Sequence, residues 1–226
     1  MVPARLEFRA AMRKFCASIL ALALFSGALF AFARPAQAAS HPLPVTPQTV
    51  AAYATVIRHI NPEMPKWQSR DFARRVIVNA ERWRLDANIL VAIVTVESHW
   101  HTHAVSRAGA IGLGQLMPGT ASMLGVNPHN SGENLSGAAC YLHGLMQRFG
   151  PNYDLVFAAY NAGPKAVEEF GGIPPYDETQ HYVVKVMSAW RSLQQWVKLS
   201  PQAAELAAIP HGADVDYWLD GGQQQR

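Results

Sequence analysis

A glutamate at the end of a long apolar segment is the residue in this sequence best suited to acid–base chemistry. The segment opens with Asp86, a good helix N-cap, and runs almost wholly apolar to Glu97. Helical spacing places Val94, Ile93 and Leu90 on the face that Glu97 shares. Apolar surroundings and the negative end of a helix dipole both raise a carboxyl pKa, so we predict that Glu97 stays protonated near neutral pH. The alternative is that Glu97 merely ends a helix and its carboxyl group points into water.

An ordered series of polar and glycine-rich motifs surrounds and follows this glutamate. Glycines at positions 109, 112 and 114 predict a tight loop or a very short hairpin between Ser106 and Gln115. The motifs are Glu97-Ser98, Ser106, Gly109-Ala110-Ile111-Gly112-Leu113-Gly114-Gln115-Leu116-Met117-Pro118-Gly119-Thr120-Ala121, Ala158-Ala159-Tyr160-Asn161-Ala162-Gly163 and Glu178-Thr179-Gln180-His181-Tyr182-Val183.

These motifs, in this order across residues 80–190, resemble those of the soluble lytic transglycosylases. The resemblance implies a mainly α, goose-type lysozyme-like domain whose groove binds strands of alternating N-acetylglucosamine and N-acetylmuramic acid. It also implies that Glu97 is the catalytic acid and base. The matching positions that line or support the groove are Ser106, Gln115, Met117, Tyr160, Asn161, Glu178 and Tyr182. Gly114 departs from the pattern, because the family usually has methionine there.

The side chains at these positions suit a carbohydrate ligand, and several also have a purely structural interpretation. Hydroxyl and amide groups bind sugar hydroxyl and acetamido groups, and tyrosine offers both an aromatic face and a hydroxyl. Tyr160 and Tyr182 can instead pack in the core with their hydroxyls satisfied. Met117 can fill a gap in the core, and Asn161 can help to end its helix.

The spacing of acidic residues bears on the mechanism. Most glycosidases use two carboxylates, yet the next acidic residue after Glu97 is Glu133, 36 positions later. The resemblance implies a mechanism with one carboxyl group and no metal or cofactor. In it, Glu97 protonates the bridging oxygen and then deprotonates the muramyl C6 hydroxyl, which leaves a 1,6-anhydromuramyl end.

Two other functions fit the same residues. A lysozyme-like hydrolase would need an acidic residue such as Asp154 or Asp177 to position water. A non-catalytic factor of a secretion or conjugation machine would use the groove only to hold the cell wall. The presence of Glu97 argues against this second alternative.

Three histidines, His99, His101 and His103, alternate just after the glutamate. Clustered imidazoles can bind zinc or copper. This stretch leaves a helix and enters a loop, however, so we predict a solvated polar cluster and no metal site.

The N-terminal residues have the layout of a secretory signal peptide. Arg5, Arg9, Arg13 and Lys14 precede an apolar run over residues 15–33, and small residues follow at Ala36 and Ala38. We expect cleavage after Ala38 and export to the periplasm. The alternative is an uncleaved membrane anchor, because the apolar run approaches the roughly 20 residues needed to span a bilayer.

Signal cleavage would change the charge balance of the protein. Residues 1–38 hold five basic residues and one acidic residue, so their removal takes the formal net charge from +3 to −1. The remaining chain lacks a basic stripe, which argues against nucleic-acid binding. The expected partner is the peptidoglycan glycan strand, bound by a monomer without a stable membrane anchor, with secretion or conjugation machinery as a further candidate partner.

The predicted organisation has four parts. They are a signal peptide at 1–38, an extended proline-rich lead-in at 39–48, the catalytic domain at 49–199 and a flexible tail at 200–226. Apolar residues at helical spacing predict helices within the catalytic domain at residues 70–83, 86–97, 135–149, 153–161 and 178–197.

Overall fold

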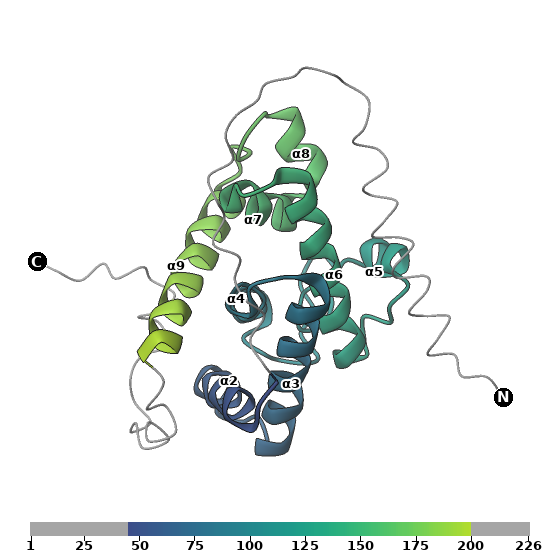
Figure 1. Ribbon diagram of the computed structural model, residues 1–226. Helices are drawn as coiled ribbons and strands as arrows, with labels where there is room; N and C mark the ends of the chain where they lie inside the picture. Colours follow the sequence, from purple (N-terminus) through teal and green to yellow (C-terminus); the bar gives the residue numbers. More distant parts are fainter. Residues whose placement is uncertain (1–44, 200–226) are drawn as a thin grey trace, which may run out of the picture.

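The computed structural model describes residues 45–199, and within this range the protein is built from helices (Figure 1). The predicted signal peptide, most of the lead-in and the predicted tail lie outside the described residues. The helices are α2 (Pro47–Ile60), α3 (Lys66–Trp83), α4 (Ala87–Ser98), α5 (Pro118–Leu124), α6 (Ser131–Phe149), α7 (Tyr153–Ala162), α8 (Pro164–Glu169) and α9 (Asp177–Leu199). The predicted mainly α class is confirmed. None of the helices in residues 45–199 has the length and apolar character needed to cross a membrane.

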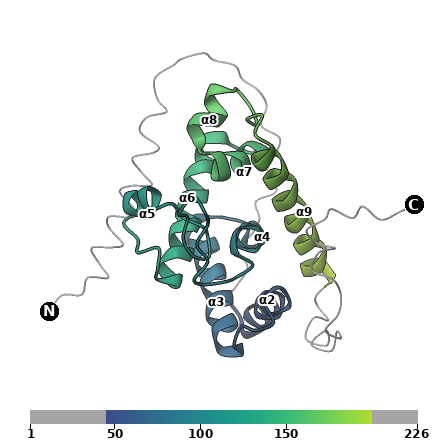
Figure 2. The ribbon, with the colours of Figure 1, turned by 180° about the vertical axis from the view of Figure 1, so that it is seen from behind.

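Helix α4 forms the centre of the core, between α9 on one side and α3 on the other (Figures 1 and 2). Its residues 89–94 are fully buried, which explains why the sequence there is almost continuously apolar. The Asp86 side chain caps the helix by accepting a hydrogen bond from the Asn88 backbone N–H at 2.8 Å. The same carboxylate accepts a hydrogen bond from Trp190 Nε1 at 2.8 Å, which ties α9 to the start of α4.

Several helices begin earlier than hydrophobic periodicity predicts, because their first turns consist mostly of polar residues. Helix α2 begins at Pro47, two residues before the expected start of the domain, because Thr46 and Thr49 form a capping box there. Helix α6 begins at Ser131 rather than at Leu135, and its N-cap Asn130 accepts a hydrogen bond from the Glu133 backbone N–H. The short helix α8 was not predicted.

The glycine-rich segment after α4 forms a compact loop rather than extended strands. Within residues 45–199 the only β pairing consists of two isolated bridges, from Val105 to Ile111 and from Ile111 to Leu116. Gly109 and Gly112 have φ angles of 86° and 77°, a conformation that glycine adopts without steric cost. This arrangement agrees with the prediction of at most a very short hairpin.

Candidate active site

Glu97 lies in the last turn of α4, where its carboxyl group is largely shielded from water. Burial raises the pKa of Glu97 from 4.5 to about 7. Tyr182 opposes this rise, because its hydroxyl donates a hydrogen bond to Glu97 Oε1 at 2.7 Å and so favours the carboxylate. The negative charge of Glu178 adds to the rise. A carboxyl group with a pKa near neutrality can exist in both protonation states, as an acid–base catalyst must.

A sharp left-handed turn ends α4 immediately after Ser98, the residue that follows Glu97. His99 and Trp100 both have positive φ angles, 48° and 63°, which is unusual for residues with large side chains. The surrounding contacts hold the turn in place. The Trp100 ring is fully buried, its Nε1 donates to Thr95 Oγ1 at 3.2 Å, and its carbonyl accepts from Asn61 Nδ2 at 3.3 Å. The turn therefore connects the end of α4 to the loop between α2 and α3.

A cleft of about 810 Å³ lies in front of Glu97. This volume falls in the range typical of ligand-binding sites. One wall is formed by residues 97–106 with Gln115, and the other by the α2–α3 loop and the start of α3. The residues from this second wall are Asn61, Glu63, Met64, Pro65 and Gln68.

The backbone of the glycine loop, residues 111–115, is held by side chains from three helices. Ser98 of α4 donates to the Leu113 carbonyl at 2.9 Å, and Tyr160 of α7 donates to the Gly114 carbonyl at 2.9 Å. Asn134 of α6 accepts from the Gly114 N–H at 2.7 Å. The loop therefore has a defined position relative to Glu97, which directly precedes Ser98.

Gln115 ends the glycine loop in a conformation that its own side chain stabilises. Its φ angle is 45°, and its Nε2 donates to the carbonyls of Gly112 at 2.9 Å and Ala104 at 3.2 Å. Both donors of the amide are thereby used within the protein. Because Gln115 lines the cleft, its Oε1 is the atom that it can offer to a ligand, as a hydrogen-bond acceptor.

Comparison with known proteins identifies the family to which this site belongs. Residues 75–182 match the family model described as the transglycosylase SLT domain, a segment that includes Glu97, the glycine loop and Tyr182. These residues belong to the transglycosylase SLT domain family. The helical architecture confirms the prediction of a mainly helical domain.

The relatives that this chain resembles are considerably longer than the chain itself. It is 29% identical over 157 residues to membrane-bound lytic murein transglycosylase F of Marinobacter nauticus, covering 66% of this chain and 29% of the relative. It is 34% identical over 122 residues to the soluble lytic murein transglycosylase of Escherichia coli, covering 43% of this chain and 19% of the relative. The chain thus spans less than a third of either relative. A solved structure of an inactive variant of lytic transglycosylase Slt from Pseudomonas aeruginosa aligns at a TM-score of 0.48 and 23% identity, covering 74% of this chain and 32% of that one.

The structure places three of the predicted site residues at the cleft. Glu97, Ser106 and Gln115 line it, and Ser106 Oγ also accepts a hydrogen bond from the Ala110 N–H at 3.0 Å within the loop. Tyr182 reaches the same place from α9 by its hydrogen bond to Glu97. The segments that carry these side chains are far apart in the sequence, since Glu97 and Tyr182 are separated by 85 positions.

The other predicted residues lie behind or beside the cleft. Tyr160 is buried and supports the glycine loop through its hydroxyl, which matches the structural interpretation of this residue. Asn161 accepts a hydrogen bond from Thr179 Oγ1 at 2.7 Å and thereby joins α7 to α9. Glu178 is exposed at the start of α9. Met117 is 44% exposed, so it does not fill a gap in the core.

Sequence reasoning missed two contributors to the site. Asn134 holds the glycine loop, and its signal in the sequence is an asparagine inside a helix, where this residue is a poor helix former. Glu63 lines the opposite wall of the cleft and precedes Glu97 in the sequence, whereas the acidic residues proposed for the hydrolase alternative follow Glu97. Asp154 and Asp177, considered for that role, lie exposed in the first turns of α7 and α9 and are not among the residues that line the cleft.

The three histidines form part of the cleft wall. His99, His101 and His103 all line it, and the Nδ1 of His101 lies 2.9 Å from the Ser98 carbonyl oxygen. Because a carbonyl only accepts hydrogen bonds, the proton of this contact belongs to Nδ1. In residues 45–199 no group of three or more histidine, cysteine or acidic side chains is arranged to bind a metal ion.

Proposed function

We propose that this protein is a peptidoglycan lytic transglycosylase. It cleaves the β-1,4 bond between N-acetylmuramic acid and N-acetylglucosamine and leaves a 1,6-anhydromuramyl end. The observation that carries the proposal is the shielded carboxyl group of Glu97. It lies on the cleft wall, accepts a hydrogen bond from Tyr182 and has a pKa of about 7. The family match and the names of the relatives, which are lytic murein transglycosylases, supply the substrate class.

In the proposed reaction, Glu97 acts twice. The protonated carboxyl group donates its proton to the bridging oxygen as the bond from that oxygen to the muramyl C1 breaks. The acetamido group of the same sugar stabilises the positive charge that develops at C1. The carboxylate of Glu97 then accepts the proton of the C6 hydroxyl, whose oxygen forms the new bond to C1. No water is consumed, and Glu97 ends in its protonated form.

Tyr182 is suited to assist both halves of this cycle. Its hydroxyl donates to Glu97 Oε1, so it stabilises the carboxylate that forms after the first proton transfer. Burial has the opposite effect and favours the protonated form. The balance between them keeps the pKa of Glu97 close to the working pH, where an acid–base catalyst is most effective.

The products of digestion test the proposal against the hydrolase alternative. Purified peptidoglycan would be incubated with the protein lacking residues 1–38, and the fragments would be analysed by mass spectrometry. We expect anhydromuramyl ends, which are lighter than reducing ends by one water molecule. Reducing ends would instead establish a hydrolase, and intact glycan that is bound but not cleaved would support the assembly-factor alternative. Asp154→Asn, at an exposed position outside the cleft, serves as the matched control and should leave products and rate unchanged.

We further propose that the protein acts as a monomer in the periplasm after removal of residues 1–38. The basic and apolar pattern of these residues supports export, and a wall-degrading enzyme needs access to the periplasmic glycan strands. An association with secretion or conjugation machinery is compatible with this location. Detection in periplasmic extracts of a mature protein that begins at Ala39 would test the export step.

Replacing Tyr182 with phenylalanine should shift the pH dependence of activity upward. The variant loses the hydrogen bond that favours the Glu97 carboxylate, so the pKa of Glu97 should rise above its present value of about 7. Because the first step needs the protonated acid, kcat/KM falls as pH rises through this pKa, and the fall should move to higher pH in Tyr182→Phe. The measurement is kcat/KM between about pH 5 and about pH 9 for both proteins. An unchanged or lower midpoint would contradict the assigned contact.

A further inference from the structure

We infer that Asn134 is a positioning residue for cleavage, acting on the cleft through the glycine loop that it holds. The inference rests on the proposed function for its catalytic consequence. The described hydrogen bonds of Asn134 do not involve Glu97, and Asn134 is not among the residues that line the cleft, so we infer that its effect passes through residues 111–115.

The Asn134 side chain is fully buried and uses its whole amide group to hold backbone. Its Oδ1 accepts from the Gly114 N–H at 2.7 Å, and its Nδ2 donates to the carbonyls of Ile111 at 2.7 Å and Pro128 at 2.9 Å. Because both acceptors of Nδ2 are carbonyls, the orientation of the amide is unambiguous. One side chain thus connects α6, both ends of the glycine loop and the segment that leads into α6.

Residue 112 of the loop lies so close to Asn134 that only glycine fits there. A Cβ atom on Gly112 would lie 2.5 Å from Asn134 Nδ2 and 2.9 Å from the Pro128 carbonyl oxygen. Its φ angle of 77° also favours glycine. The absence of a side chain at Gly112 is therefore what allows the amide of Asn134 to reach the loop backbone.

The same loop is connected to the end of the catalytic helix and to the cleft. Ser98, the residue after Glu97, donates to the Leu113 carbonyl between the two attachment points of Asn134. Gln115 follows directly and lines the cleft. Displacement of the loop would therefore move a cleft-lining side chain relative to the Glu97 carboxyl group. Misplacement of reacting groups by about 1 Å can lower a rate roughly 100-fold.

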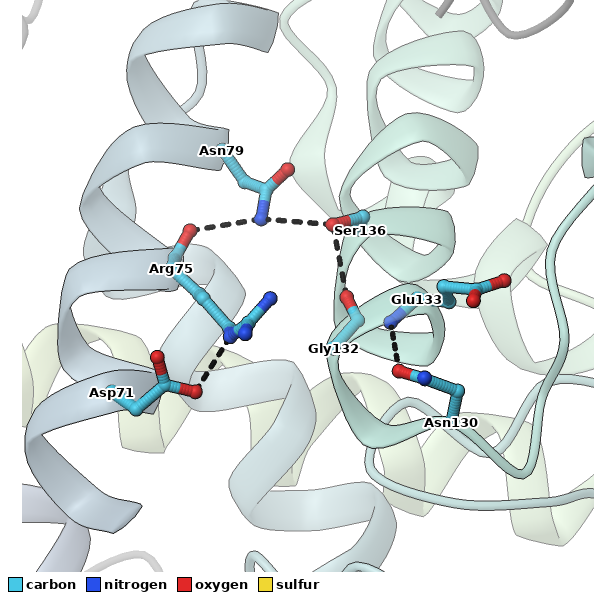
Figure 3. Close-up of polar contacts among 7 residues, drawn as sticks. All are labelled: Asp71, Arg75, Asn79, Asn130, Gly132, Glu133 and Ser136. Carbon is cyan, nitrogen blue, oxygen red and sulfur yellow. Dashed lines mark hydrogen bonds and ion pairs between the residues drawn. The ribbon is translucent and has the colours of Figure 1, made fainter. Parts of the chain in front are cut away.

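The test compares Asn134→Ala with Asn79→Ala. Asn79 is another buried asparagine next to α6, and it belongs to the polar contacts between α3 and α6 in Figure 3. Its Nδ2 donates to the Arg75 carbonyl at 2.8 Å and to Ser136 Oγ at 3.3 Å, and none of its described hydrogen bonds involves the glycine loop. Both substitutions remove an amide from a buried site, so a general loss of stability affects both variants.

Two readouts separate positioning from stability. The first is hydrogen exchange at the amides of residues 111–115, which needs no substrate. We expect the Gly114 amide to lose protection in Asn134→Ala but not in Asn79→Ala, under conditions where both variants remain folded by circular dichroism. The second is kcat per folded molecule on peptidoglycan, which should fall roughly 10- to 100-fold in Asn134→Ala and by less than about 3-fold in Asn79→Ala.

The experiment distinguishes failure of the inference about Asn134 from failure of the proposed function. If the unmodified protein cleaves no glycan, the proposed function fails, while the exchange experiment still reports whether Asn134 holds the loop. Unchanged loop exchange in Asn134→Ala would overturn the inference. An equal loss of kcat in Asn79→Ala, or a full kcat in Asn134→Ala with a loosened loop, would overturn it as well.

Discussion

Glu97→Gln is expected to lower the rate of glycan cleavage by about three orders of magnitude, because the variant has neither the acid nor the base of the proposed cycle. Glutamine has nearly the same shape and can still accept the hydrogen bond that Tyr182 donates to Oε1. The substitution therefore removes the titratable proton of the carboxyl group while it leaves the shape of the cleft almost unchanged. The rate of formation of anhydromuramyl ends, measured at saturating peptidoglycan, tests the expectation. More than about a tenth of the original rate would exclude Glu97 as the principal acid.

The stability of the same variant provides a control for its folding. Glu97 is protonated in the folded protein up to a pH of about 7, whereas an unfolded chain loses this proton near its ordinary pKa of 4.5. The wild-type fold therefore loses stability as the pH rises from about 4.5 to about 7, and the loss stays constant above that range. Because glutamine does not titrate, Glu97→Gln should be more stable than the wild type by about 3 kcal/mol at about pH 8. Denaturant unfolding at about pH 4 and about pH 8 measures the difference, which should vanish at the lower pH.

Gly114→Ala is expected to destabilise the protein by about 3 kcal/mol, because a new methyl group has no space there. A Cβ atom at this position would lie 2.5 Å from Ala138 Cβ and 3.1 Å from the Tyr160 hydroxyl. Ala138 is fully buried and belongs to α6, so its Cβ cannot rotate away as a flexible side chain would. A methionine side chain at this position would meet the same obstacle. Thermal or denaturant unfolding would measure the loss.

A second substitution should partly reverse this effect. Ala138→Gly removes the atom that obstructs the new methyl group, although it costs about 1 kcal/mol of helix propensity by itself. We expect the double variant to be more stable than Gly114→Ala alone, which a double-mutant cycle would reveal as a favourable coupling. Gly119→Ala is the matched control, because a Cβ atom there meets nothing within 4 Å. Additive losses of stability in the double variant would show that Ala138 is not the reason why position 114 requires glycine.

The sequence predicted the features that depend on local pattern. An apolar run that begins at a helix cap predicted α4, and the position of Glu97 at the end of this run predicted a carboxyl group that stays protonated near neutrality. Apolar periodicity likewise located α3, α6, α7 and α9, with errors where the first turns are polar. Glycine spacing predicted the tight loop. These features follow from the chain itself, because a helix cap, an apolar face and a positive φ angle each involve residues only a few positions apart.

Only the tertiary structure decided which polar groups meet around the glutamate. The Tyr182 hydroxyl reaches Glu97 from a helix 85 positions away, and Asn134 and Tyr160 reach the two polar groups of the Gly114 backbone from α6 and α7. The structure also placed Glu63 on the cleft wall and exposed Met117 to solvent. No periodicity encodes such pairs, since a buried hydrogen bond depends on the distance and direction between atoms that packing of the helices brings together. The sequence by itself therefore determined that Glu97 lies at the end of a buried helix, and the packing of α4 against α9, with the loop held by α6 and α7, determined what surrounds this carboxyl group.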